Sequence, residues 1–184
     1  MSAAPFAIMD VETTHGDPRQ GRIMEVAIVL HDGRSAVDRW HSLIDPREPI
    51  PPFIRQLTGL REHMLKGAPT FARIARMIDG FTRDRIVVAH NTRYDLTALD
   101  HEFARTGLRY DRDTLCTEQL CRRLLPQLAH HNLGSMCRYF GIPFEVAHRA
   151  MSDAEATAAL LGALMNRFGA AELLGPHRRL RLSA

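Results

Sequence analysis

The stretch Phe6-Ala7-Ile8-Met9-Asp10-Val11-Glu12-Thr13-Thr14 carries the strongest signal for both fold and chemistry in this chain. Phe6 to Val11 is a short apolar run typical of a buried β-strand. Asp10 and Glu12 stand two residues apart at its end, and residues i and i+2 of a strand point to the same face. The stretch therefore predicts two carboxylates projecting into one spot. Taken alone, it also fits a solvated strand end that carries two acids by chance.

The rest of the chain predicts a mixed sheet flanked by helices. Strands are expected over Arg22 to Leu30 and Val37 to Ile44, and the short connections between them indicate an antiparallel meander. Arg85 to Ala89 is short and β-branched, which is typical of a buried parallel strand. Apolar periodicity, caps and stop signals predict helices over 53–57, from Thr70, from Thr92 to before Gly107, over 115–125, over 132–140 and over 152–168. This order of elements indicates one domain of the α/β class.

The composition is that of an ordinary folded domain. The 184 residues are 45% hydrophobic and 24% charged, and the formal net charge is +3 with Lys66 as the sole lysine. A pI near 9.1 permits a polyanionic partner such as nucleic acid. No apolar run reaches the ~20 residues that cross a bilayer, and the N-terminus lacks a signal-peptide pattern, so no membrane association is expected. The three cysteines contain no C-x-x-C pair, so we expect reduced, packed thiols and a cytoplasmic protein.

Two further acidic segments follow predicted elements. Asp95 falls about one turn into the helix after the fourth strand, where ligands of open sheets collect, although it also suits the helix dipole. Ser152 and Glu155 form a capping box that predicts a helix start, with Asp153 in its first turn. His148 lies in the loop before that helix. A loop histidine is usually a surface residue, but its position five residues before Asp153, with two other acidic clusters in the chain, favours a functional role.

Carboxylates gathered in one cleft repel each other unless cations neutralise them. Hard oxygen donors suit Mg²⁺ or Mn²⁺, and two such ions can stabilise both the attacking and the leaving oxygen in phosphodiester hydrolysis. A neutral histidine nearby can accept the proton of an attacking water. A zinc site built from His130, His131 and the three cysteines is disfavoured because the spacings do not fit.

Together the three segments resemble the motifs of the DEDDh 3′–5′ exonucleases, which have a ribonuclease H-like fold. The family includes the proofreading epsilon subunit of bacterial DNA polymerase III and stand-alone homologues. The motifs appear in family order as Asp10-Val11-Glu12-Thr13-Thr14, His90-Asn91-Thr92-Arg93-Tyr94-Asp95 and His148-Arg149-Ala150-Met151-Ser152-Asp153-Ala154. The resemblance implies an exonuclease domain over residues 6–168 and a short basic tail over 169–184.

The resemblance also implies roles for particular residues. It implies that the metal ligands are Asp10, Glu12, Asp95 and Asp153. His148 is expected to be the general base. The expected contacts to the terminal nucleotide come from Thr13, Thr14, Leu57, Thr58, His90 and Asn91, with Leu57 as a wedge against the last base.

Three positions depart from the family pattern. His15 follows Glu-Thr-Thr where glycine is frequent, Thr58 stands where some proofreading subunits have histidine, and Tyr94 replaces the commoner phenylalanine. Each leaves the ligands and the base in place, so the chemistry is expected to survive while substrate preference is less defined.

The expected reaction is release of nucleoside 5′-monophosphates from the 3′ end of single-stranded DNA, with two divalent cations and a histidine base. An RNA-directed exonuclease of the same family is an alternative, as is an adaptor subunit of a polymerase or repair complex. Arg178, Arg179 and Arg181 of the tail fit either nucleic-acid contacts or a solvated end.

Overall fold

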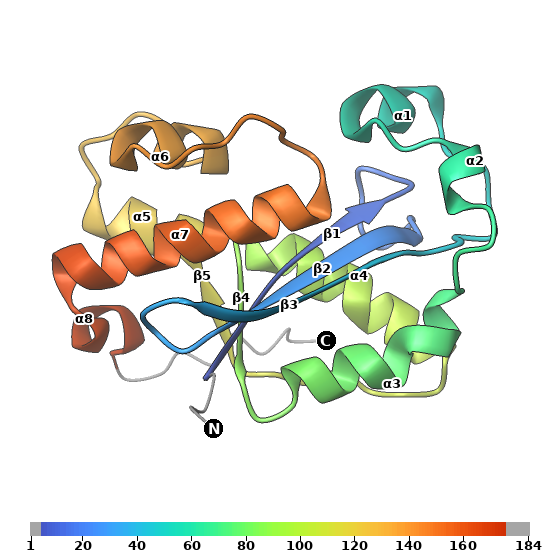
Figure 1. Cartoon of the computed structure of the whole chain (residues 1–184), viewed down its shortest axis with the longest axis horizontal. Helices are drawn as coiled ribbons and strands as arrows, with labels where there is room; N and C mark the ends of the chain where they lie inside the picture. Colours follow the sequence, from blue (N-terminus) through green and yellow to red (C-terminus); the bar gives the residue numbers. More distant parts are fainter. Residues whose placement is uncertain (1–4, 176–184) are drawn as a thin grey trace.

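The structure, a computed structural model, describes residues 5–175 and consists of a five-stranded mixed sheet with helices on both faces (Figure 1). The strands are β1 (Phe6–Thr13), β2 (Ile23–His31), β3 (Ala36–Leu43), β4 (Ile86–Ala89) and β5 (Thr114–Cys116). The helices are α1 (Pro52–Thr58), α2 (Glu62–Leu65), α3 (Phe71–Thr82), α4 (Thr92–Arg105), α5 (Thr117–Leu124), α6 (Leu133–Phe140), α7 (Ala150–Phe168) and α8 (Ala170–Leu174).

The sheet order is β3-β2-β1-β4-β5. β1, β2 and β3 pair antiparallel, which confirms the predicted meander. β4 pairs parallel with β1 on one side and with β5 on the other, which confirms the predicted buried parallel strand. β1 is therefore the central strand, and it extends beyond the carboxyl end of β4, because the pairing ends at Ile8 while β1 continues to Thr13.

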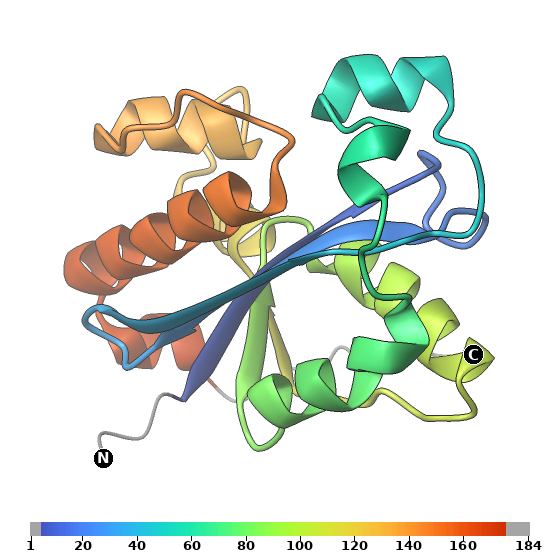
Figure 2. The same cartoon turned by 45° about the vertical axis from the view of Figure 1, so that its right-hand side comes forward.

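The two faces of β1 enter two different cores. Ala7, Met9 and Val11 pack with α3 and α4, and Phe6 and Ile8 pack with α5, α6 and α7. Figure 2 shows α3 and α4 on one side of the sheet and α7 on the other. Because side chains alternate along a strand, Asp10 and Glu12 continue the row of Phe6 and Ile8 and face the α7 side.

A small separate cluster fixes α1 and α2 beside the carboxyl end of β1 (Figure 1). Ile50, Ile54, Leu60 and Leu65 pack there around Met24 of β2. The N-terminal half of this α1–α2 unit matches the helix predicted over 53–57. α2 was not predicted, because four residues are too short for a periodic signal.

Two predicted helix starts are wrong. The segment predicted as helix from Leu115 begins as β5, because Val87 pairs with Thr114 and Val88 with Leu115 before α5 begins at Thr117. The last long helix begins at Ala150, so Ser152 lies within its first turn and does not cap it. A short apolar run cannot by itself be assigned to strand or helix, and a capping box can occur inside a helix.

The stretch after Phe168 contains the short helix α8, whose Leu173 is buried against α7. The tail arginines 178, 179 and 181 lie outside the described residues. Within residues 5–175, no helix is both long and apolar enough to cross a membrane.

Candidate active site

Asp10 and Glu12 lie where β1 extends past its parallel neighbour. The β1–β4 pairing covers Phe6 to Ile8 of β1 and ends there, while β1 continues to Thr13. Asp10 is half-buried, and Glu12 is 9% exposed. Two carboxylates on a central strand at this depth can remain charged only if other groups or ions compensate them.

Asp95 reaches the same strand end from α4. β4 ends at Ala89, and α4 begins three residues later, so Asp95 in its first turn lies beside β1. The backbone N–H of Val11 donates to Oδ1 of Asp95 at 3.1 Å. Val11 lies between Asp10 and Glu12 in the chain, so this hydrogen bond ties Asp95 directly to the acidic strand end.

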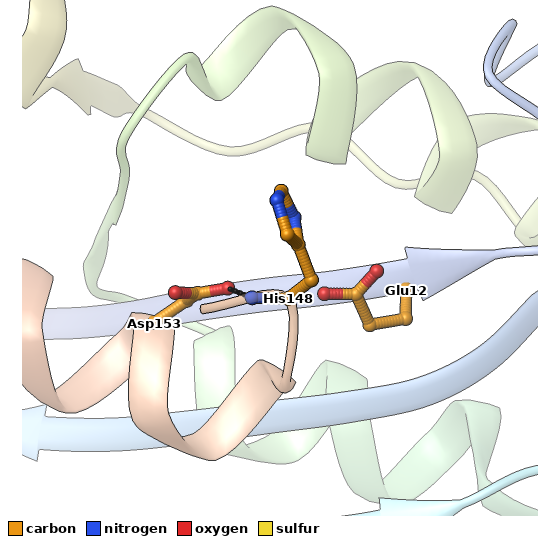
Figure 3. Close-up of side chains that lie close together, drawn as sticks. All are labelled: Glu12, His148 and Asp153. Carbon is orange, nitrogen blue, oxygen red and sulfur yellow. Dashed lines mark hydrogen bonds between the residues drawn. The ribbon is translucent and has the colours of Figure 1, made fainter. Parts of the chain in front are cut away.

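Asp153 enters from the opposite side of the sheet. It lies in the first turn of α7 and is 7% exposed, and its carboxylate accepts the backbone N–H of His148 at 2.9 Å (Figure 3). His148 has a positive φ of 60° and an exposed side chain. One ligand atom each from Glu12, His148 and Asp153 lies within 4.8 Å of the others. α7 and the segment before it therefore bring a carboxylate and an imidazole close to Glu12.

Burial and mutual repulsion raise the pKa values of the four acids. Burial raises the pKa of Asp10 well above its ordinary value, with further contributions from Asp95, Glu12 and Asp153. Burial also raises the pKa of Glu12 to about 8 and that of Asp95 to about 8, and it raises the pKa of Asp153 to about 6. The four carboxylates thus share one electrostatic environment, although they come from β1, α4 and α7.

This donor set fits divalent cations. Carboxylate oxygens are the hard ligands that Mg²⁺ and Mn²⁺ prefer. Arg149 lowers the pKa of Glu12, and His148 lowers that of Asp153, but burial dominates in both cases. Positive charge brought to the strand end would therefore relieve an unfavourable concentration of negative charge.

Some residues predicted to contact a substrate are bonded within the rim of the site. The Thr13 hydroxyl lies within hydrogen-bond reach of the Tyr94 hydroxyl and donates to the carbonyl of His15. The Thr14 hydroxyl donates to Glu48, and the same oxygen accepts the Arg22 N–H at 2.8 Å. The Thr13 contact holds the loop after β1 against α4, and the Thr14 contacts hold it against Glu48 and the residue before β2.

Other predicted contacts differ in accessibility. Leu57 is 40% exposed on α1, whereas Thr58 is buried and its hydroxyl is bonded within the end of the same helix. His90 lies within 2.9 Å of the Thr117 hydroxyl and 2.8 Å of the carbonyl of His131, so both its ring nitrogens are engaged. Asn91 is exposed and precedes α4 in a left-handed conformation.

The sequence reasoning missed Glu25 and Arg149. Glu25 lies opposite Glu12 in the β1–β2 register and is 1% exposed. It forms an ion pair with Arg149, the residue between His148 and the start of α7. A glutamate inside the otherwise apolar run of β2 was the available signal, because such a residue needs a buried partner.

Comparison with known protein families gives one match over most of the chain. The RNase_T family model, described as exonuclease, matches residues 7–161. The match spans the strands, helices and loops that carry all four carboxylates and His148.

The curated relatives are much longer than this chain, and each matches it over a small part of its own length. It is 36% identical over 157 residues to the DNA polymerase III PolC-type of Halalkalibacterium halodurans, covering 85% of this chain and 11% of that protein. It is 31% identical over 169 residues to the 3′-5′ exonuclease DinG of Staphylococcus aureus strain USA300, covering 91% of this chain and 19% of that protein. The chain thus spans less than a fifth of the length of these relatives.

Solved structures share the fold. A structure described as Exonuclease X in complex with 5′ overhanging duplex DNA has a TM-score of 0.70 and 29% identity, covering 89% of this chain and 93% of that one. A structure of E. coli Exonuclease I in complex with a dA16 oligonucleotide has a TM-score of 0.78 and 20% identity, covering 89% of this chain and 41% of that one. At that identity the second likeness concerns the fold alone.

Proposed function

This chain belongs to the RNase_T exonuclease family, and from that premise we propose that it is a divalent-metal-dependent 3′–5′ exonuclease acting on single-stranded DNA. The observation that carries the proposal is the convergence of Asp10, Glu12, Asp95 and Asp153 from three elements, with His148 beside them. The products are nucleoside 5′-monophosphates.

The four carboxylates are the proposed ligands of two Mg²⁺ or Mn²⁺ ions. When bound, such ions stabilise the negative charge that develops on the phosphodiester and orient the reacting groups. Asp95 is held for this task by the N–H of Val11, and Asp153 by the N–H of His148. Both ligands are therefore fixed by backbone groups of the site itself.

His148 is the proposed general base. Its exposed side chain stands beside Glu12 and Asp153, close enough to take a proton from a water that attacks the phosphorus (Figure 3). Its backbone is anchored by Asp153, so the ring stays near the carboxylates while facing solvent. This combination suits a group that must accept a proton in each turnover and release it to water.

The proposed binding site for the 3′-terminal nucleotide lies between the loop after β1 and α1. Thr13 and Thr14 line the loop, and Leu57 presents an exposed apolar side chain from α1 as a wedge against the terminal base. Asn91 adds an exposed polar group before α4. His90 and Thr58 support this rim from within, because their polar atoms are engaged by the protein.

The DNA preference and the setting of the reaction are supported by the relatives. Exonuclease X and Exonuclease I are described in complex with DNA, and the PolC-type relatives are named as DNA polymerases. A polymerase or repair complex is therefore the proposed context. A cytoplasmic location is proposed as well, and it is supported by three cysteines that are all buried and free.

A time course on 5′-labelled single-stranded DNA and on RNA of the same sequence tests the proposal. With Mg²⁺ or Mn²⁺ we expect a DNA ladder that shortens from the 3′ end, and EDTA should abolish it. A faster RNA ladder would make the chain an exoribonuclease. If neither DNA nor RNA is cleaved in Mn²⁺, the proposed nuclease activity would be contradicted and an adaptor subunit would be favoured.

A further inference from the structure

Glu25 is a fifth buried carboxylate that the proposed chemistry does not use. It lies on β2 directly opposite Glu12, and its side chain is 1% exposed. All nine residues of β2 are buried. A carboxylate in such a place destabilises the fold unless it is paired and hydrogen-bonded, so its partners reveal what it holds.

Four nitrogen groups surround the Glu25 carboxylate. The Arg149 guanidinium donates from Nε to Oε2 at 3.1 Å and from Nη2 to Oε1 at 2.9 Å, which is a two-pronged arrangement. The backbone N–H of Ala150 donates to Oε2 at 3.2 Å, and His41 Nε2 lies 2.7 Å from Oε1. Both oxygens of Glu25 are therefore engaged by hydrogen bonds from the protein.

Two of these partners form the start of α7. Arg149 occupies the N-cap position, and its own side chain makes no capping hydrogen bond. Ala150 is the first residue of the helix, and its N–H is one of the groups that a helix start leaves unpaired. Glu25 satisfies that group from a different element, at a helix start two residues before the predicted capping box.

His148 is consequently held from both sides. Its own N–H is bound by Asp153, and the next residue in the chain is bound by Glu25. Its positive φ of 60° lies in the left-handed region, which is uncommon for residues other than glycine. Figure 3 shows the histidine on the short segment that enters α7, between Asp153 and Glu12.

We propose that Glu25 and Arg149 are positioning residues that fix the His148 segment relative to the β1 carboxylates. The inference rests on the proposed role of His148 as the base. Glu25 is attached to β1 through the sheet and to His148 through Arg149, so it relates the base to the ligands without touching substrate. We call the Glu25–Arg149 ion pair the clamp. Weakening the clamp should slow the chemical step and leave the binding of DNA and of metal nearly unchanged.

Glu25→Gln tests the clamp because it keeps the size of the side chain and removes its charge. Glu102→Gln is the matched control. Glu102 is 2% exposed and binds Arg22 through Nε at 2.6 Å and Nη2 at 3.2 Å, together with the N–H of Ile23 at 3.3 Å. Both variants should lower the melting temperature. Only Glu25→Gln should lower kcat, by about 10-fold or more, which corresponds to about 1.4 kcal/mol in the barrier.

The KM for the oligonucleotide and the Mg²⁺ concentration at half-maximal rate should stay within about twofold of wild type in Glu25→Gln. Arg149→Met should lose a similar factor in kcat, and the double variant should lose no more than the larger single loss, because one interaction is removed in each. Equal kcat losses in Glu25→Gln and Glu102→Gln would overturn the proposal. A large rise in the Mg²⁺ requirement would overturn it too, since Glu25 would then be a ligand.

An NMR measurement separates this inference from the proposed function. The imidazole resonances of His148, assigned with His148→Ala, should shift or broaden in Glu25→Gln and remain in place in Glu102→Gln. Unperturbed resonances in Glu25→Gln would overturn the clamp whatever the activity. A wild-type protein without nuclease activity would contradict the proposed function, while the NMR result would still decide whether the clamp holds His148.

Discussion

Asp95 illustrates how a single side chain combines two tasks. Its Oδ1 accepts the N–H of Val11 at 3.1 Å, and its charge joins the cluster around Asp10 and Glu12. The first task holds α4 against the end of β1, and the second adds a carboxylate to the proposed cation site. The two tasks can be separated, because the first needs only an oxygen while the second needs the charge.

Asp95→Asn should therefore keep the fold and lose the activity. The amide oxygen can still accept the Val11 N–H, but the lost ligand should lower kcat/KM by more than about 10³-fold, since a catalytic cation contributes several kcal/mol. Burial raises the pKa of Asp95 to about 8, so its charged form is unfavourable in the folded protein. In EDTA above that pH, the variant should melt at a higher temperature than wild type.

Asp100→Asn, an exposed change on the same helix, is the control and should alter neither property. Thermal melts with and without Mg²⁺, together with the oligonucleotide assay, give both readings. An Asp95→Asn protein with wild-type activity would remove Asp95 from the ligand set.

His148→Ala tests the proposed role of this single side chain as the general base. The side chain is exposed, so the melting temperature should change little, while kcat should fall by about 10²–10⁴-fold, the range for a lost general base. His130→Ala, another exposed histidine, should retain full activity. Unchanged turnover in His148→Ala would assign the proton transfer to another group.

At the scale of elements, α1 presents an apolar ridge next to the site. Phe53 is 69% exposed and Leu57 is 40% exposed, and residues four apart lie on one face of a helix. The other face carries Ile54 into the small cluster that anchors α1 and α2. The helix is thus fixed by its buried side, while its exposed side is free to contact a flexible strand.

Phe53→Ala and Leu57→Ala should each weaken DNA binding. Stacking of a base on an aromatic side chain contributes about 1–3 kcal/mol, so KM for single-stranded DNA should rise by about 5- to 150-fold in Phe53→Ala. The rise should be smaller in Leu57→Ala, because an aliphatic side chain contacts a base without stacking on it. The melting temperature should remain near that of wild type because both side chains are exposed. Met77→Ala removes a 49% exposed side chain from α3 and should leave KM unchanged. Equal KM values in all three variants would place the DNA elsewhere.

At the scale of the whole molecule, the sheet separates two cores, and the site lies at the carboxyl end of its central strand. β1 and β4 run parallel, and both end where α4 and α7 begin. One helix delivers its carboxylate from each face of the sheet. The site therefore depends on how the helices on the two faces of the sheet are placed relative to each other. Loss of helix packing on either face should abolish activity even while the strands remain paired.

The cores also determine how stability depends on alkaline pH. Burial raises the pKa of Cys121 to about 12 and that of Cys137 to about 11, from 9.0 for a free thiol, and it raises the pKa of Tyr110 to about 12 from 10.0. An acid whose pKa is higher in the folded state stabilises the fold below its unfolded pKa and loses that contribution as pH rises toward the folded value. The free energy of unfolding should therefore fall above about pH 9.

Urea titrations between pH 7 and 10.5 measure this dependence. Cys137→Ala should show a shallower decline than wild type, because one of the shifted groups is gone. The three thiols should react with a thiol reagent only in denaturant, as all are buried. A free energy of unfolding that stays level or increases over this range would contradict the assignment of these groups to the cores.

Local pattern was sufficient for much of this molecule. The apolar run of β1 and the spacing of Asp10 and Glu12 predicted a strand with two carboxylates on one face, and the order of elements predicted the mixed sheet. The helix predicted over 132–140 is present as α6, with Asn132 at its N-cap position, where the Asn132 side chain accepts the N–H of Ser135. Each of these features is determined by residues that are close in sequence, because strand periodicity and helix capping involve only near neighbours.

The tertiary structure decided what depends on residues far apart. β5 exists because β4 offers it a partner, and no periodicity in Thr114 to Cys116 distinguishes it from a helix start. The N–H of Ala150 at the start of α7 donates to Glu25, which lies 125 positions away in the chain. The sequence by itself determined which chemical groups are available and on which faces they lie. Only the packing of helices on both sides of the sheet brought those groups together. Contacts between distant segments are stabilised by the burial of apolar surface and by ion pairs, which a local sequence pattern does not reveal.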